Sequence, residues 1–177
     1  MIADRPYIAN KIIESVQTFN QLIQELDADQ FEKSVEGKWS AGQDLAHLIK
    51  TLKIIGLAFI LPKVLLKLLY GEANRPSRSP EELYEKYKGN LAKGGKAPAA
   101  FIPKKVRFAK ADELLQQHEY YGKLLIKRLN KISEKDLDTY LLPHPLIGRI
   151  TLREMLCFTF IHTNHHYRAL ENKLQGH

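Results

Sequence analysis

Three of the seven histidines lie close together near the C-terminal end of the chain: His162, His165 and His166. On an α-helix, residues four positions apart lie one above the other, so the imidazoles of His162 and His166 can point at one atom. The apolar residues of this segment cluster on the side of that pair, whereas His165 is turned by about 100° from His166. We therefore expect His162 and His166 to face the protein interior, with His165 at its edge. Such a pair supplies half of a typical transition-metal site.

A third ligand is required, because catalytic metal sites usually combine three protein ligands with an open position for water or substrate. His47 is the best candidate, since it lies among the apolar residues of another predicted helix, and helices of a bundle lie side by side. Position 163 is Thr, so the Glu of the H-E-x-x-H peptidase motif is absent. Neutral imidazole suits Zn, Ni, Cu or Fe, and the residue types do not choose among these metals.

Structural explanations compete with the metal site for each of these residues. A single histidine on an apolar helix commonly bonds to a carbonyl group in the core, and an H-x-x-x-H pair also arises by chance. His118 is flanked by Gln and Glu residues, and we expect it to face water. Cys157 lies about 140° from His162 around the helix, and we interpret it as a buried structural cysteine.

The spacing of apolar residues predicts helices over most of the chain. Long helices are expected at 6–26, 41–61, 111–131 and 152–174, and shorter ones at 63–70 and 80–89. Ser40 with Gln43 and Thr151 with Glu154 have the form of capping boxes, which mark where the second and the last long helices begin. Residues 140–150 are expected to be a Pro- and Gly-containing loop, and short strands, for example around 101–108, would not define the fold. Four long helices predict an all-α four-helix bundle, with residues 1–177 as a single domain.

The composition is that of an ordinary globular protein, with 177 residues, 44% hydrophobic residues and a formal charge of +7. The charge is uneven: residues 86–110 contain eight Lys and Arg and no acidic residue, so the rest of the chain sums to −1. This segment is interpreted as a solvated basic loop or, alternatively, as one that attracts an anionic substrate. No helix-turn-helix or zinc-finger pattern accompanies the charges, so no nucleic-acid partner is predicted.

No membrane span is predicted, because the longest uncharged piece of the most apolar stretch is 54–62, and a spanning helix needs about 20 apolar residues. We expect that stretch, 45–70, to be a buried core helix; the alternative is a membrane-surface or dimer-forming segment. The N-terminal residues lack the apolar core of a signal peptide, and the single cysteine excludes an intrachain disulfide. A reducing, cytoplasmic location is therefore expected.

Two blocks of the sequence resemble the DinB/YfiT-like superfamily. The first is 37–48, in which Trp39-Ser40 is followed by His47-Leu48. The second begins with His144-Pro145, passes through Gly148 and leads into the helix that carries the H-x-x-x-H pair. The two blocks together are fairly specific, and the resemblance covers most of the chain in order. The stretch 63–108 has no counterpart that we recognise in the family; it could cover the metal pocket or make a dimer contact.

The resemblance implies a four-helix bundle that holds a divalent metal, Ni²⁺ or Zn²⁺, through three histidines, which match His47, His162 and His166. It also implies a homodimer that acts on a small-molecule substrate. The implied activity is either transfer dependent on a low-molecular-weight thiol (an S-transferase) or hydrolysis, with the metal lowering the pKa of a bound thiol or water. The alternative function is a non-catalytic helical bundle that binds a ligand or a protein and keeps a vestigial metal site.

Overall fold

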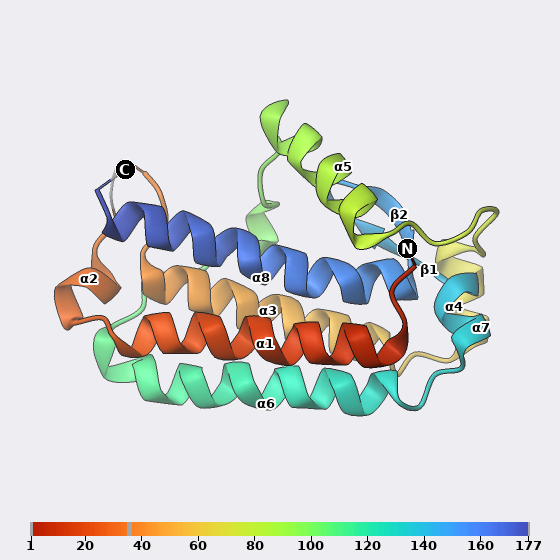
Figure 1. Ribbon diagram of the computed structural model, residues 1–177, viewed down its shortest axis with the longest axis horizontal. Helices are drawn as coiled ribbons and strands as arrows, with labels where there is room; N and C mark the ends of the chain where they lie inside the picture. Colours follow the sequence, from red (N-terminus) through yellow and green to blue (C-terminus); the bar gives the residue numbers. More distant parts are fainter. Residues whose placement is uncertain (1, 35–36, 177) are drawn as a thin grey trace.

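Four long helices form the body of the protein in a computed structural model that describes residues 2–34 and 37–176. They are α1 (Arg5–Gln24), α3 (Ala41–Ala58), α6 (Ala111–Leu129) and α8 (Leu152–Leu174). Each packs on two others, in the cyclic order α1, α6, α3, α8 (Figure 1). The predicted all-α four-helix bundle is confirmed.

Shorter elements join the long helices. They are α2 (Ala28–Glu32), α4 (Lys63–Tyr70), α5 (Pro80–Ala92), α7 (Glu134–Thr139), and two 3₁₀ turns at Ala99–Phe101 and Phe108–Lys110. Helices α3 and α6 run in the same direction through the bundle (Figure 1). The chain between them must therefore return along the length of the molecule, and on the way α5 crosses α8. This return is the partly helical basic connection that the sequence predicted.

Residues 140–150, expected to be a loop, instead contain a β-hairpin. Strand β1 (Leu141–His144) pairs antiparallel with β2 (Gly148–Thr151), from Leu141 opposite Thr151 to His144 opposite Gly148. Leu142 and Ile150 lie opposite each other and are buried, and this shared apolar face selects the pairing. Gly148 adopts a φ of 85°, which side chains other than glycine rarely tolerate. The strand considered around 101–108 does not form; both ends of that segment are 3₁₀ turns.

The apolar stretch 45–70 divides into a buried and an exposed part. Leu45, Leu48 and Leu52 of α3 are buried in the core, as expected for a core helix. By contrast, Val64 and Leu68 of α4 are each 80% exposed. The membrane-surface or dimer-forming interpretation of this end stays a prediction. Among the described residues, no helix combines the length and the apolar character needed to cross a membrane.

The start of α8 is held by a buried ionic network. The Glu154 carboxylate is fully buried and accepts hydrogen bonds from both terminal nitrogens of Arg75, at 2.6 and 2.9 Å. It also accepts from the backbone amides of Arg78 and Thr151, at 2.7 and 2.9 Å. Burial alone would raise the pKa of Glu154, but these hydrogen bonds outweigh it and lower that pKa. One carboxylate therefore caps α8 and anchors the chain that leads into α5.

Replacing Glu154 with Gln should lower the free energy of unfolding by about 2–3 kcal/mol. The two buried oxygens that accept from Arg75 would lose their negative charge, and one of them would be replaced by an amide group that donates. Urea denaturation measures this change. The matched control is Glu85→Gln on α5, where the glutamate is exposed and has no ion pair with a described residue. Equal urea midpoints for the two variants would contradict the anchoring role of Glu154.

His118 is completely buried, so the expectation that it faces water is wrong. Its Nδ1 lies 2.7 Å from Oδ1 of Asn20 and donates to it, and its ring meets the edge of Phe19. The reason is its position: His118 is three residues after Leu115 and seven before Leu125, on the buried face of α6. Burial lowers its pKa to about 3, so the ring is neutral in the folded protein.

The free energy of unfolding should consequently fall with acidification, because His118 takes up a proton in the unfolded chain but not in the folded one. The folded pKa of about 3 lies below the unfolded value of 6.5, so this contribution is complete above pH 6.5 and is lost as the pH falls towards 3. The slope is at most about 1.4 kcal/mol per pH unit for one group. His118→Gln keeps a donor for Asn20 but cannot titrate, so urea denaturation between pH 7 and pH 4.5 should show a shallower dependence. An unchanged slope would contradict this origin.

Candidate metal centre

Three imidazoles from two helices meet at one point inside the bundle. Nε2 of His162 lies 3.3 Å from Nε2 of His47 and 3.1 Å from Nε2 of His166. His47 comes from α3, and the other two come from successive turns of α8. One ligand atom from each of the three lies within 4.8 Å of the others. The structure thus brings together the three residues that the sequence selected.

Hydrogen bonds on the far side of two rings fix which nitrogen faces the centre. Nδ1 of His47 donates to the carbonyl oxygen of Phe101 at 2.9 Å, and Nδ1 of His166 donates to Oδ1 of Asp44 at 2.8 Å. With the proton on Nδ1, the lone pair of Nε2 points inward in both residues. This orientation is the one that metal-binding histidines require.

The surroundings also keep His47 and His162 uncharged. Burial, followed by the neighbouring His166, lowers the pKa of His47 to about 4. Burial, followed by the neighbouring imidazoles, lowers the pKa of His162 well below its ordinary value of 6.5. Neutral imidazole is the form that coordinates a metal, so no proton need leave these two rings near pH 7.

The spacing fits a divalent transition metal. Metal–nitrogen bonds of about 2.0–2.1 Å in tetrahedral geometry place the ligand nitrogens roughly 3.4 Å apart. The two Nε2 separations of 3.1 and 3.3 Å are close to that value. Three imidazole nitrogen donors suit a divalent transition metal such as Zn, Ni, Cu or Fe, and an ion held by three protein ligands would leave a position for water or substrate.

Local sequence explains how the helices deliver the three rings. Ser40 and Gln43 form the expected capping box at the start of α3, and Thr151 and Glu154 form the second one at the start of α8. Trp39, just before α3, stacks on the ring of His166 with an interplanar angle of 9° and a centroid separation of 6.0 Å. The chain entering α3 therefore also packs against α8.

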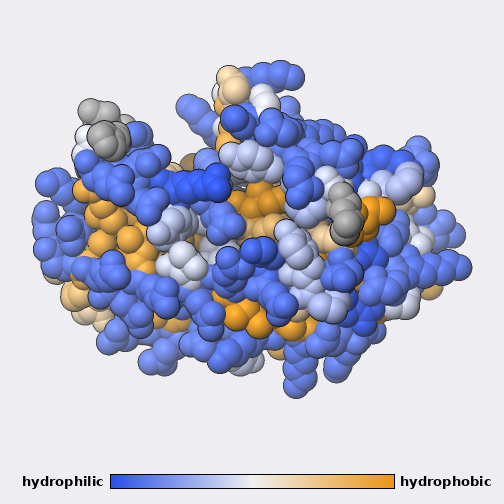
Figure 2. Space-filling model, viewed as in Figure 1, coloured by the Kyte–Doolittle hydropathy of each residue, from blue (hydrophilic) through white to orange (hydrophobic). Residues whose placement is uncertain are grey.

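A cavity of about 620 Å³ opens beside the histidines. It lies between α3, α5, α8 and the segment 95–102, and Figure 2 shows apolar surface in the notch beside α5. Its walls are largely apolar, with contributions from Ile55, Leu91, Pro98, Leu146 and Phe158. This volume suits a small organic molecule.

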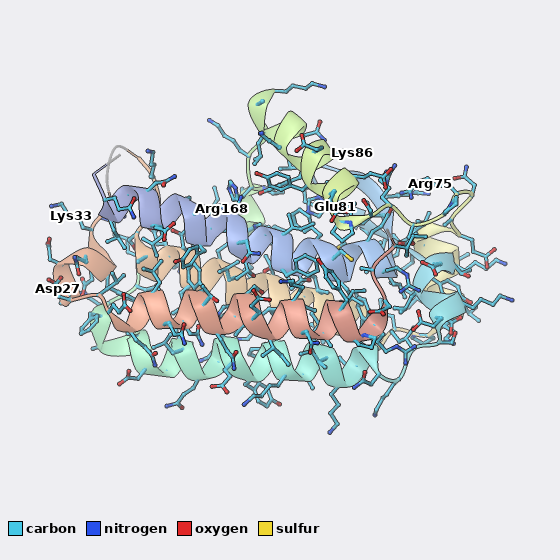
Figure 3. The ribbon with its side chains drawn as sticks, in the orientation of Figure 1. Asp27, Lys33, Arg75, Glu81, Lys86 and Arg168 are labelled. Carbon is cyan, nitrogen blue, oxygen red and sulfur yellow. The ribbon has the colours of Figure 1, made fainter. Side chains whose placement is uncertain are left out.

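Positive charge lines the cavity, but little of it comes from the basic segment. Of the eight basic residues in 86–110, only Lys96 lines the cavity; Lys86, labelled on α5 in Figure 3, does not. Lys38 and Lys173 join Lys96 from other parts of the chain. Asp44 is the one acidic residue among the lining residues that the structure describes, and it is bound to His166.

Several other residues of interest take clear positions. His165 lines the cavity beside the three-histidine cluster, at its edge as expected. Cys157 is buried, and burial raises the pKa of its thiol to about 12, so it is a structural residue. Tyr87 and His144 line the cavity too. Sequence reasoning did not select Tyr87, and it named His144 only as the start of the second family block. They come from α5 and the hairpin, whose places beside α8 no local pattern showed.

Comparison with known proteins identifies the family of the chain. A family model for the DinB superfamily matches residues 12–170. The chain belongs to the DinB superfamily. No curated protein matches it in sequence.

A solved structure shares the DinB-type fold. It is YfiT from Bacillus subtilis, described as a probable metal-dependent hydrolase with an unusual four-helix bundle topology. The TM-score is 0.62 at 16% sequence identity, and the match covers 97% of this chain and 87% of that chain. At this identity the likeness concerns the fold. The resemblance inferred from the Trp39-Ser40 and His144-Pro145 blocks is confirmed at the level of family and fold.

Asp44→Asn should weaken the binding of Zn²⁺ by about 10–100-fold, because the carboxylate that orients His166 and raises its basicity is lost. Trp39 is the single tryptophan and contacts His47 and His166, so its emission should report a zinc titration of metal-free protein. Asp112→Asn, at an exposed residue in the first turn of α6, serves as the control and should bind zinc like the parent protein. Equal zinc affinities for both variants would remove Asp44 from the site.

Proposed function

We propose that this protein is a metal-dependent enzyme that acts on a small molecule, with Ni²⁺ or Zn²⁺ held by His47, His162 and His166. The observation that carries the proposal is the convergence of three Nε2 atoms, two of them 3.1 and 3.3 Å from the third, beside a largely apolar cavity. A bound divalent ion would lower the pKa of a coordinated thiol or water, so that thiolate or hydroxide exists near neutral pH.

The residues of the chain would prepare the reacting groups in three ways. The bonds from His47 to Phe101 and from His166 to Asp44 hold two rings in place before any ligand arrives. The apolar walls limit the water around the substrate, which strengthens electrostatic interactions there. The lysines of the cavity favour a substrate or thiol that carries a negative charge.

Thiol-dependent S-transfer is the reaction that we propose first. Asp44, the one acidic residue described in the cavity, already accepts from His166 and is not free to act as a general base. A thiol is far more acidic than water, so a metal-bound low-molecular-weight thiol would become a thiolate with less need of such a base than a metal-bound water. Its sulfur would bond to an electrophilic carbon of the substrate as a leaving group departs with the bonding electrons.

Hydrolysis is the second candidate, supported by the description of YfiT, a protein of the same fold, as a probable metal-dependent hydrolase. We also propose that residues 1–177 form one domain, that the protein works as a homodimer, and that it functions in the cytoplasm. The buried, unpaired Cys157 is compatible with a reducing compartment.

The test begins with elemental analysis of purified protein, which should find about one Ni²⁺ or Zn²⁺ per chain, as a single three-histidine site predicts. His47→Ala should abolish stoichiometric metal, because two ligands alone hold it poorly. The zinc- and nickel-loaded proteins are then assayed with glutathione or cysteine as the thiol and 1-chloro-2,4-dinitrobenzene as the electrophile. Chloride release and thioether formation should exceed the rate of metal-free protein at least tenfold.

Hydrolysis is assayed in parallel with 4-nitrophenyl acetate and no thiol. Acceleration of this reaction alone would select hydrolysis over S-transfer. Metal bound equally by the parent and by His47→Ala would contradict the site itself. Tight metal binding without acceleration of either reaction would favour the non-catalytic alternative, a binding module with a vestigial site.

A further inference from the structure

His144 stands at the end of strand β1 and lines the cavity beside the histidine cluster. Its Nδ1 accepts two backbone hydrogen bonds, from the amide of Leu146 at 3.2 Å and from that of Ile147 at 3.1 Å. The side chain therefore closes the turn of the hairpin. This role uses one of the two ring nitrogens.

The two backbone donors determine where the proton of the ring lies. A nitrogen that accepts from two N–H groups carries a lone pair and no hydrogen, so the neutral imidazole of His144 must carry its proton on Nε2. Burial lowers the pKa of His144 to about 4, which keeps the ring neutral near pH 7. The turn thus selects the tautomer opposite to that of His47 and His166, whose protons lie on Nδ1.

The Nε2 proton has no hydrogen-bond acceptor among the residues that the structure describes, and Nε2 is not among their buried unpaired atoms. Nε2 therefore keeps some accessible surface, and the residue that carries it lines the cavity. The ring centroids of His144 and Phe158 are 4.1 Å apart. Phe158 in turn stacks on His162, with a centroid separation of 5.3 Å. A fixed donor therefore stands on the cavity wall close to the proposed metal.

We propose that Nε2–H of His144 donates a hydrogen bond to an oxygen of the substrate, and that substrates are apolar molecules bearing a carbonyl or carboxylate oxygen. The inference rests on the proposed function, because it assigns the substrate class of the same cavity. Three observations carry it: the tautomer set by the turn, the unused donor, and an apolar cavity whose described lining residues include lysines but no free carboxylate. His144 would orient the substrate and stabilise negative charge on its oxygen during reaction.

Nitrogen NMR of the parent protein tests the donor without any substitution. Long-range ¹H–¹⁵N spectra of metal-free and zinc-loaded protein should show Nε2 of His144 protonated and Nδ1 unprotonated. Addition of benzoate, an apolar body with a carboxylate, should shift the Nε2–H resonance of His144 downfield. A proton on Nδ1, or no response of Nε2–H to bound benzoate, would overturn the proposal.

Two matched variants separate the donor from the role in the turn. In His144→Asn the amide oxygen takes the place of Nδ1 and preserves the turn, but the donor at Nε2 is lost. In His144→Gln the amide nitrogen reaches the place of Nε2, while the acceptor for the turn is lost. We expect His144→Asn to weaken benzoate binding by about tenfold and His144→Gln to weaken it much less. The reverse order would show that His144 serves the turn alone.

Thermal midpoints and zinc content are measured on the same samples, so that a variant that fails to fold is recognised. If a variant fails to fold, the NMR experiment on the parent protein tests the proposal by itself. This design also distinguishes the two proposals. Absence of stoichiometric metal in the parent protein would overturn the proposed function while leaving the tautomer and the benzoate response of His144 measurable in metal-free protein.

Discussion

The structure depends most on one constraint: three imidazoles must converge on a single point within an apolar bundle. Such an arrangement is unfavourable without partners on the outer side of the rings, because buried polar groups need hydrogen bonds. Asp44 and the carbonyl of Phe101 meet this need for two of the three histidines. The second of these comes from the long connection, so the site involves three separate parts of the chain.

That connection follows from the direction of the helices. Because α3 and α6 run in parallel, residues 59–110 must cross back along the molecule, and they use the crossing to build one side of the cavity. Its anchors are specific: Glu154 holds Arg75 before α5, and Phe101, Ala100 and Pro103 accept through their carbonyls from side chains of α3. The segment that no pattern explained is therefore part of the site's architecture.

Much of the candidate site could be predicted from local spacing. The separation of four residues between His162 and His166 requires that they share a helix face, and the choice of His47 needed only an apolar helix beside them. The error over His118 had a different origin, since its sequence neighbours are polar while its helix-face neighbours, Leu115 and Leu125, are buried. The hairpin was missed because its pairing depends on burial of Leu142 and Ile150 against the bundle.

By itself, the sequence determined the all-α class and the starts of α3 and α8, and it selected three histidines as candidate metal ligands, because helix periodicity and capping act over three or four residues. Only the tertiary structure decided the tautomers of His47 and His166, the position of His144 and the source of charge in the cavity. These depend on contacts between residues far apart in the chain: His166 bonds Asp44 across 122 positions, and His47 bonds Phe101 across 54. Local patterns carry no information about such partners.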